Sequence, residues 1–175
     1  KVGEKADFSV STEAGCTYQW YKNGEKLLTE KEATISISNV DKSQDGDTYY
    51  CVVTKNGTSI STDVVTLTVK NQLPTNVTIE LNKTTIVSGD EVIIRAQAMG
   101  VVDFYQWYKN NVEIPGATEA ILTYSNITKG DEGLYYCEVS NDGGSAKSNS
   151  IEIKILPSSN FTIVANDEAV SEGDT

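Results

Sequence analysis

The chain of 175 residues has no histidine, three prolines, one methionine and three cysteines, and it contains no long apolar run. Without histidine it lacks the commonest general base and the commonest transition-metal ligand. Without a run of about 18 apolar residues it has no candidate for a bilayer-spanning helix. Basic residues are also few: 14 Lys and Arg stand against 25 Asp and Glu, a net charge of −11. This charge opposes binding to nucleic acid and to anionic membranes.

The most informative feature that is present is an internal repeat. The hexapeptide Tyr18–Asn23 recurs unchanged as Tyr105–Asn110, and its tryptophans are 87 residues apart. A second signature, Asp45–Cys51, returns as Asp131–Cys137, and its cysteines are 86 residues apart. A period of this size indicates one module copied in series.

The repeat divides the chain into two units and the start of a third. The predicted boundaries are a first domain at residues 1–70, a linker at 71–76, a second domain at 77–155, a linker at 156–160 and the start of a third domain at 161–175. Ser88–Glu91 is echoed by Ser171–Asp174, which marks this third start. Lys1 aligns with the interior of the second unit, so the first domain is expected to lack its N-terminal strand. Both ends are interpreted as cuts through a longer polypeptide.

Short segments rich in β-branched and aromatic residues, separated by Gly, Asn, Asp and Ser, predict an all-β fold. No sustained 3.6-residue apolar period is present, so helices longer than one turn are not expected. The strands are predicted at residues 6–10, 35–38, 49–54 and 64–69 in unit one, and at 77–81, 91–97, 104–108, 120–124, 134–139 and 150–155 in unit two. Hairpin turns are predicted at Asn23-Gly24, Asn56-Gly57 and Asp142-Gly143-Gly144, because these residues accept positive φ.

The Tyr-Gln-Trp-Tyr motif followed by Asp-x-Gly-x-Tyr-x-Cys resembles the immunoglobulin family. The resemblance implies tandem immunoglobulin-like antiparallel β-sandwiches of Greek-key topology, of the I-set type, like beads on a string. The second unit carries Gly133 in this motif where the first has Asp47. The implied core residues are the strand-C tryptophans, the corner tyrosines and the strand-F cysteines: Trp20, Tyr49, Cys51, Trp107, Tyr135 and Cys137.

The units depart from the family pattern at the strand-B cysteine, which normally forms the inter-sheet disulfide. That position is Val10 in unit one and Ala96 in unit two. Cys16 lies four residues before Trp20, too far along its strand to face Cys51 within disulfide reach. We therefore expect three free thiols, and this favours a bacterial or phage protein over a secreted eukaryotic one.

Other motifs give weak signals. Acidic residues cluster at Asp41, Asp45 and Asp47 and again at Asp131 and Glu132, and we interpret both clusters as solvated loops rather than metal sites. No metal, cofactor or catalytic residue is predicted. Five Asn-x-Ser/Thr sites are interpreted as chance, although a secreted eukaryotic protein could carry glycans on them: Asn56, Asn76, Asn82, Asn126 and Asn160.

Tyrosines next to the two tryptophans are candidates for binding. If Trp20 points inward, alternation along the strand puts Tyr21 on the outer face of the sheet, and Tyr108 likewise in unit two. Aromatic rings there can stack on sugars or contact a protein. They can equally be cross-strand pairs that support the sheet.

The sequence thus predicts a non-enzymatic structural or adhesive array of immunoglobulin-like repeats that projects from a surface. The favoured interpretation is a phage virion protein, in a decoration or fibre, that attaches weakly and multivalently to host-cell or glycan surfaces. The expected partners are other subunits of a virion or cell-surface assembly and cell-surface carbohydrate, without nucleic acid or membrane insertion. The alternatives are a bacterial cell-surface adhesin repeat, accessory domains of a secreted polysaccharide-active enzyme, and a eukaryotic receptor ectodomain.

Overall fold

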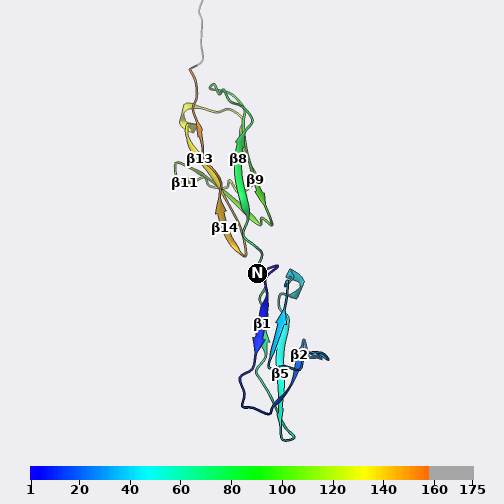
Figure 1. Ribbon diagram of the computed structural model, residues 1–175. Coiled ribbons are helices and arrows are strands. Elements are labelled where there is room, and N and C mark those ends of the chain that lie inside the picture. Colours follow the sequence, from blue (N-terminus) through cyan, green and yellow to red (C-terminus); the bar gives the residue numbers. More distant parts are fainter. Residues whose placement is uncertain (158–175) are drawn as a thin grey trace, which may run out of the picture.

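The structure, a computed structural model, describes residues 1–157 and shows two β-sandwiches placed end to end (Figure 1). Lys1 lies at the joint between the sandwiches, and the chain leaves the second sandwich at its far end. The predicted all-β architecture is confirmed. The expected start of a third domain at residues 161–175 lies outside the described residues. Within residues 1–157, no helix has the length and apolar character to cross a membrane.

Unit one contains two antiparallel sheets. The strands are β1 (Ala6–Ser9), β2 (Thr17–Lys22), β3 (Glu25–Lys26), β4 (Thr34–Ile37), β5 (Thr48–Lys55), β6 (Thr58–Ser61) and β7 (Val65–Thr66). One sheet pairs β1 with β4, and the other has the order β3-β2-β5-β6, with β7 also on β5. A single 3₁₀ turn, η1 (Lys42–Gln44), precedes β5.

Unit two repeats this layout with one more strand. The strands are β8 (Thr75–Leu81), β9 (Val92–Met99), β10 (Phe104–Lys109), β11 (Val112–Glu113), β12 (Ile121–Tyr124), β13 (Gly133–Asn141), β14 (Gly144–Lys147) and β15 (Ile151–Ile153). The sheets are β12-β9-β8 and β11-β10-β13-β14, with β15 also on β13. The turn η2 (Lys129–Asp131) matches η1.

The alternation of apolar and polar residues explains why these segments form strands with one buried face. In β13 the burial alternates along the whole strand, with Tyr135, Cys137 and Val139 turned into the sandwich. The predicted strands agree with the observed ones apart from their ends. The sequence analysis missed β3 and β11, which have two residues each, and the outer hairpin arms β6 and β14.

Each sandwich has its own core, and the core of unit two is more completely enclosed. Strand β9 lies between β12 and β8, whereas β1 pairs only with β4 among the described residues. Three inward side chains of β9, those of Val92, Ile94 and Ala96, are buried, but their counterparts in unit one are only partly buried: Ala6, Phe8 and Val10. The extra strand β8 therefore accounts for the tighter core of unit two.

Candidate interaction surfaces

The two tryptophans are the centre of each core. Trp20 on β2 lies opposite Cys51 on β5, and Trp107 on β10 lies opposite Cys137 on β13. Both rings are buried, and each indole nitrogen donates to a backbone carbonyl, at 2.9 Å in unit one and 2.8 Å in unit two. These residues hold the two sheets together and leave no indole surface for a ligand.

The corner tyrosines are buried but bonded differently. The hydroxyl of Tyr135 donates to the carbonyl of Asp131 at 2.7 Å and lies 3.1 Å from the hydroxyl of Tyr124. Burial raises the pKa of Tyr135, and the hydroxyl of Tyr124 raises it further. In unit one the hydroxyl of Tyr49 is buried without a hydrogen-bond partner, and its ring stacks on Phe8 at 4.5 Å.

The cysteines are free thiols. Cys51 and Cys137 are fully buried, and burial raises the pKa of both thiols, that of Cys137 to about 11. The thiolate is the reactive form, so such buried thiols are inert. Thr17 pairs with Thr54, so Cys16 lies beyond that pair and far from Cys51 along the ladder. Cys16 lines an open hollow at the end of unit one.

The motif before the buried cysteine has Asp47 in unit one and Gly133 in unit two, and this difference has a local structural reason. Gly133 has a φ of 153°, and a Cβ there would lie 2.7 Å from the side chain of Asn110. In unit one, Asp47 accepts from the amide of Asn23 at 2.7 Å and pairs with Lys22 at 2.7 Å. Lys22 and Asn23 hold the pKa of the Asp47 carboxyl below its ordinary value. Unit one thus has an ion-paired aspartate at the position where unit two has a glycine.

The clustered carboxylates accept hydrogen bonds from backbone N–H groups. Asp41 caps η1 by accepting from Ser43 N, and Asp45 accepts from Val69 N at 2.7 Å. In unit two, Thr128 N donates to Asp131 at 2.8 Å, and Glu132 accepts from Ile155 N at the same distance. Within residues 1–157, no group of three or more potential ligands from His, Cys, Asp and Glu is placed to hold a metal ion.

Tyr21 and Tyr108 lie on the outer face of their sheets as cross-strand pairs. Tyr21 stacks on Tyr50 with ring centroids 4.6 Å apart, and Tyr108 stacks on Tyr136 at 4.8 Å. In unit two the ammonium of Lys147 lies 5.1 Å from the ring of Tyr136. We call these two the tyrosine pairs. They support the sheet and at the same time present a partly exposed aromatic surface on each unit.

A network of hydrogen bonds and ion pairs fixes the joint between the units. Lys42 on η1 donates to Asp142 of the β13–β14 turn at 2.6 Å and to the carbonyl of Val69, also at 2.6 Å. The other carboxylate oxygen of Asp142 accepts from Asn71 N at 2.9 Å. The ammonium of Lys42 and the amide of Asn71 together lower the pKa of Asp142 to about 2.

The linker backbone contacts the same turn. Asn141, which is only 8% exposed, donates to the carbonyls of Gln72 at 2.6 Å and Val101 at 2.9 Å. A Cβ at Gly143 would lie 2.1 Å from the carbonyl oxygen of Asn71, so only glycine lets the linker approach this closely. Pro74 is fully buried. The linker is therefore part of the packed structure.

The sequence analysis missed the joint and the partners of the tyrosine pairs. Asp142 and Gly143 were assigned only a turn-forming role, because nothing local indicates a contact with Lys42, a hundred residues earlier. Tyr50 and Tyr136 could have been found: each precedes a buried cysteine and must point outward by alternation.

Comparison with known proteins identifies the family of the chain and its relatives. The sequence model of the immunoglobulin domain family matches residues 7–69 and 76–155. The chain is 26% identical to the muscle M-line assembly protein unc-89 of Caenorhabditis elegans, over 98% of this chain and 2% of that protein. It is 32% identical to contactin-4 of Homo sapiens, over 75% of this chain and 14% of that protein. The chain thus spans a small part of these relatives.

Solved structures show the same fold. An amphioxus IgVJ-C2 molecule matches with a TM-score of 0.55 and 20% identity, over 89% of this chain and 98% of that one. The four N-terminal Ig domains of Dscam1 isoform 6.9 match with a TM-score of 0.54 and 22% identity, over 89% of this chain and 42% of that one.

The curated relatives are animal proteins, so they give no support for the phage and bacterial resemblance that the sequence analysis favoured, and they favour its eukaryotic alternative. With the family model matched over most of its length, the chain belongs to the immunoglobulin domain family.

Proposed function

We propose that the chain is part of an adhesion-type immunoglobulin array at an animal cell surface, where it spaces and presents contact surfaces for other proteins. The main observation behind this proposal is the joint between the units. Its hydrogen bonds and ion pair hold the two sandwiches in one elongated arrangement. The resemblance to a relative whose name states a membrane anchor, the MAM domain-containing glycosylphosphatidylinositol anchor protein 2 of Mus musculus, supports the cell-surface setting.

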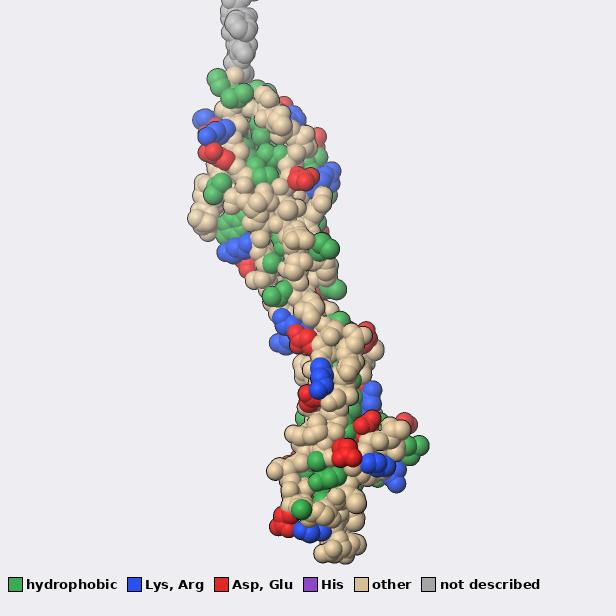
Figure 2. Space-filling model, in the orientation of Figure 1, with side chains coloured by type: hydrophobic (Ala, Val, Ile, Leu, Met, Phe, Trp, Pro, Cys, Tyr) green, Lys and Arg blue, Asp and Glu red, His purple; other side chains and the backbone are tan. Residues whose placement is uncertain are grey.

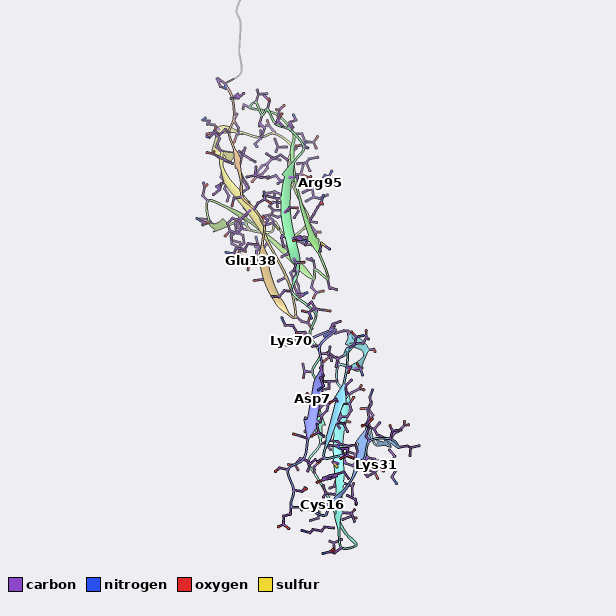
Figure 3. All side chains as sticks on the ribbon, in the orientation of Figure 1. Asp7, Cys16, Lys31, Lys70, Arg95 and Glu138 are labelled. Carbon is purple, nitrogen blue, oxygen red and sulfur yellow. The ribbon has the colours of Figure 1, made fainter. Side chains whose placement is uncertain are left out.

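The tyrosine pairs are the contact surface on each unit. Aromatic residues are enriched at protein interfaces because they combine a large apolar area with a polar hydroxyl. Tyr108 and Tyr136 lie on the sheet that carries Glu138, on the side of the sandwich away from Arg95 (Figure 3). One pair is a small surface, so a single unit binds weakly and many copies together supply avidity.

The test compares multivalent with monomeric chain. Beads coated with the chain are expected to bind cultured animal cells, and soluble monomer is expected to compete only at high concentration. A variant in which all four tyrosines of the two pairs are changed to Ser, at positions 21, 50, 108 and 136, should bind at least about tenfold less in this multivalent format. Arg95→Ser, on the opposite outer face, is the matched control and should bind normally. Equal binding by the tyrosine variant would contradict the proposal.

The nature of the partner follows from pretreating the cells. Trypsin treatment should abolish bead binding if the partner is a protein. If glycosidase treatment abolishes binding and trypsin does not, the partner is carbohydrate, and the protein-contact proposal fails.

A second candidate is a structural array inside the cell, like a muscle assembly protein. Two observations favour it: the resemblance to unc-89 and the three free thiols, since disulfides are rare in the cytosol. Intact mass of native material, with thiol alkylation but no reductant, separates the two candidates. Glycan mass on Asn56 or Asn126 places the chain outside the cell, whereas three alkylated thiols without glycan favour the intracellular array.

A further inference from the structure

Unit one has a pocket between its two sheets. Strand β4 lines it from one sheet, and the end of β2, the strand β3 and the loop after β3 line it from the other. Its volume is about 410 Å³, within the range of roughly 300–1,000 Å³ that is common for small-molecule sites. All of its lining residues fall between Lys22 and Tyr49, so the middle part of the unit forms the pocket by itself.

The side chain of Tyr49 lines this pocket and carries an unpartnered hydroxyl. Tyr49 is only 2% exposed, and its hydroxyl has no hydrogen-bond partner among residues 1–157. Burial raises the pKa of Tyr49, so the hydroxyl keeps its proton at neutral pH and is able to donate it. A buried hydroxyl without a partner is unfavourable, so a ligand that pairs with it gains affinity.

Unit two shows which group fits beside this hydroxyl. There the corresponding tyrosine is Tyr135, and its hydroxyl lies 3.1 Å from that of Tyr124. The two rings meet edge to face with their centroids 6.1 Å apart. Ile37 holds the position of Tyr124 in unit one: each is the last residue of its strand and lies five residues before the first residue of its 3₁₀ turn. Ile37 and Tyr49 both line the pocket, so the smaller isoleucine leaves room there for a ring.

The second partner of Tyr135 is also lost in unit one, because the corner is one residue longer. The hydroxyl of Tyr135 donates to the carbonyl of Asp131, which ends η2 four residues earlier. In unit one Gln44 ends η1 five residues before Tyr49. No other carbonyl among residues 1–157 accepts from Tyr49 in its place. The free hydroxyl therefore follows from two differences in sequence.

The charges around the pocket favour a neutral ligand. Lys22 is paired with Asp47 at 2.7 Å, and Lys26 and Glu30 add one charge of each sign. Figure 2 shows basic, acidic and hydrophobic side chains close together on this arm of unit one, near the position labelled Lys31 in Figure 3. The side chains between the charges are apolar: Leu27, Ile35 and Ile37. An ion would be buried there without a free partner, whereas a neutral ring would not.

We propose that this pocket binds a phenol, either as a small molecule or as the side chain of a tyrosine in a partner protein. The phenol ring lies where Tyr124 lies in unit two and packs on Ile35 and Ile37. Its hydroxyl accepts from the hydroxyl of Tyr49. Unit two carries this ring within its own chain, so the site belongs to unit one.

The first test is an NMR titration of the chain with p-cresol and with toluene, which differs from p-cresol only by lacking the hydroxyl. p-Cresol should bind saturably with a Kd of about 1 mM and should shift the signals of Ile35, Ile37 and Tyr49. Toluene should bind about three- to tenfold more weakly, because it cannot pair with Tyr49. Absence of saturable shifts at these residues, or equal affinity for the two ligands, would overturn the proposal.

The second test removes the hydroxyl of Tyr49. Tyr49→Phe should fold normally, since the hydroxyl has no partner to lose within residues 1–157. It should lower the affinity for p-cresol about three- to tenfold and leave the affinity for toluene unchanged. An equal loss for both ligands would mean that the pocket has changed shape and no hydrogen bond to the ligand was lost, which contradicts the proposal.

The third test fills the pocket from within the chain. Ile37→Tyr supplies the ring that unit two has and should abolish p-cresol binding, with circular dichroism as the check on folding. Ile60→Tyr is the matched control, because this isoleucine of the same unit is 72% exposed and lies outside the pocket; it should bind p-cresol like the wild type. Binding that persists in Ile37→Tyr would place the ligand elsewhere, for example on the tyrosine pairs, and refutes the assignment.

A last titration distinguishes the two sources of the phenol. N-acetyltyrosinamide carries the same ring with a peptide group on each side. If it binds as tightly as p-cresol and loses binding in Ile37→Tyr, the pocket accepts a tyrosine side chain of a partner protein. If p-cresol binds and N-acetyltyrosinamide does not, the pocket accepts a small phenol. Either result supports the phenol site.

Discussion

The two units have the same central sheet but differ in how well their cores are enclosed. Strand β2 pairs with β5 through six residue pairs, and β10 pairs with β13 through the equivalent six. Around this shared ladder, unit two is covered by β8, whereas β1 of unit one has only β4 as a neighbour among residues 1–157. The comparison shows that the sheet that carries the tryptophan is specified by its own residues. Burial of the core depends in addition on a strand of the other sheet, β8.

The largest expected difference concerns one pair of matched valines. Val139→Ala should lower the free energy of unfolding of unit two by about 2 kcal/mol, because it removes buried methyl groups and leaves a cavity. Val53→Ala, in the open core, should lower that of unit one by about 1 kcal/mol or less. Hydrogen exchange in denaturant, read by mass spectrometry in dilute monomer, gives separate values for each unit. Equal losses would contradict the difference in enclosure between the two cores.

The next largest difference in stability between the units is expected at the corner tyrosines. Tyr135→Phe should destabilise unit two by about 1 to 2 kcal/mol, because the carbonyl of Asp131 loses its donor. Tyr49→Phe should change unit one by less than about 0.5 kcal/mol, since its buried hydroxyl has no partner to lose. Thermal unfolding of the two variants checks this order, and a larger loss for Tyr49→Phe would reverse the comparison.

A smaller effect should follow from loosening the joint that connects the two units. Gly143→Ala must displace the linker from the β13–β14 turn, so the relative orientation of the units should become variable. Each sandwich should keep its stability within about 0.5 kcal/mol, as expected for a change away from the core. Residual dipolar couplings measure the orientation. Gly130→Ala is the control, because a Cβ there has its nearest neighbour at 3.6 Å.

Acid should produce the smallest effect, through Asp142. Its pKa is lowered from about 3.9 in an unfolded chain to about 2 in the folded one, first by Lys42 and then by Asn71 N. The contribution of Asp142 is therefore fully present above about pH 5 and is lost as the pH falls through about 2. Side-chain carbon shifts of Asp142 follow the titration by NMR. The effect should weaken in salt, since the ion pair is exposed, and Asp142→Asn should remove it.

The sequence predicted those features that depend on neighbouring residues. The repeated hexapeptide Tyr-Gln-Trp-Tyr-Lys-Asn and the motifs ending in Cys51 and Cys137 were enough to predict the central strands, because alternation and burial follow from local order. The joint could not be predicted, because Lys42 and Asp142 meet only after both sandwiches have folded and docked. The unpartnered hydroxyl of Tyr49 has a similar origin: Ile37 stands where unit two has Tyr124.

The joint also determines how the pair of units responds to a pulling force. Tension along the chain first strains the hydrogen bonds of Asn141 and the exposed ion pair of Asp142, which are weaker than either core. Once these contacts break, the linker residues 71–74, which precede β8, can straighten, but they span only about 14 Å. The pair thus lengthens by a small, bounded step while both sandwiches stay folded. When the tension ends, the contacts re-form, so the joint extends and shortens reversibly under load.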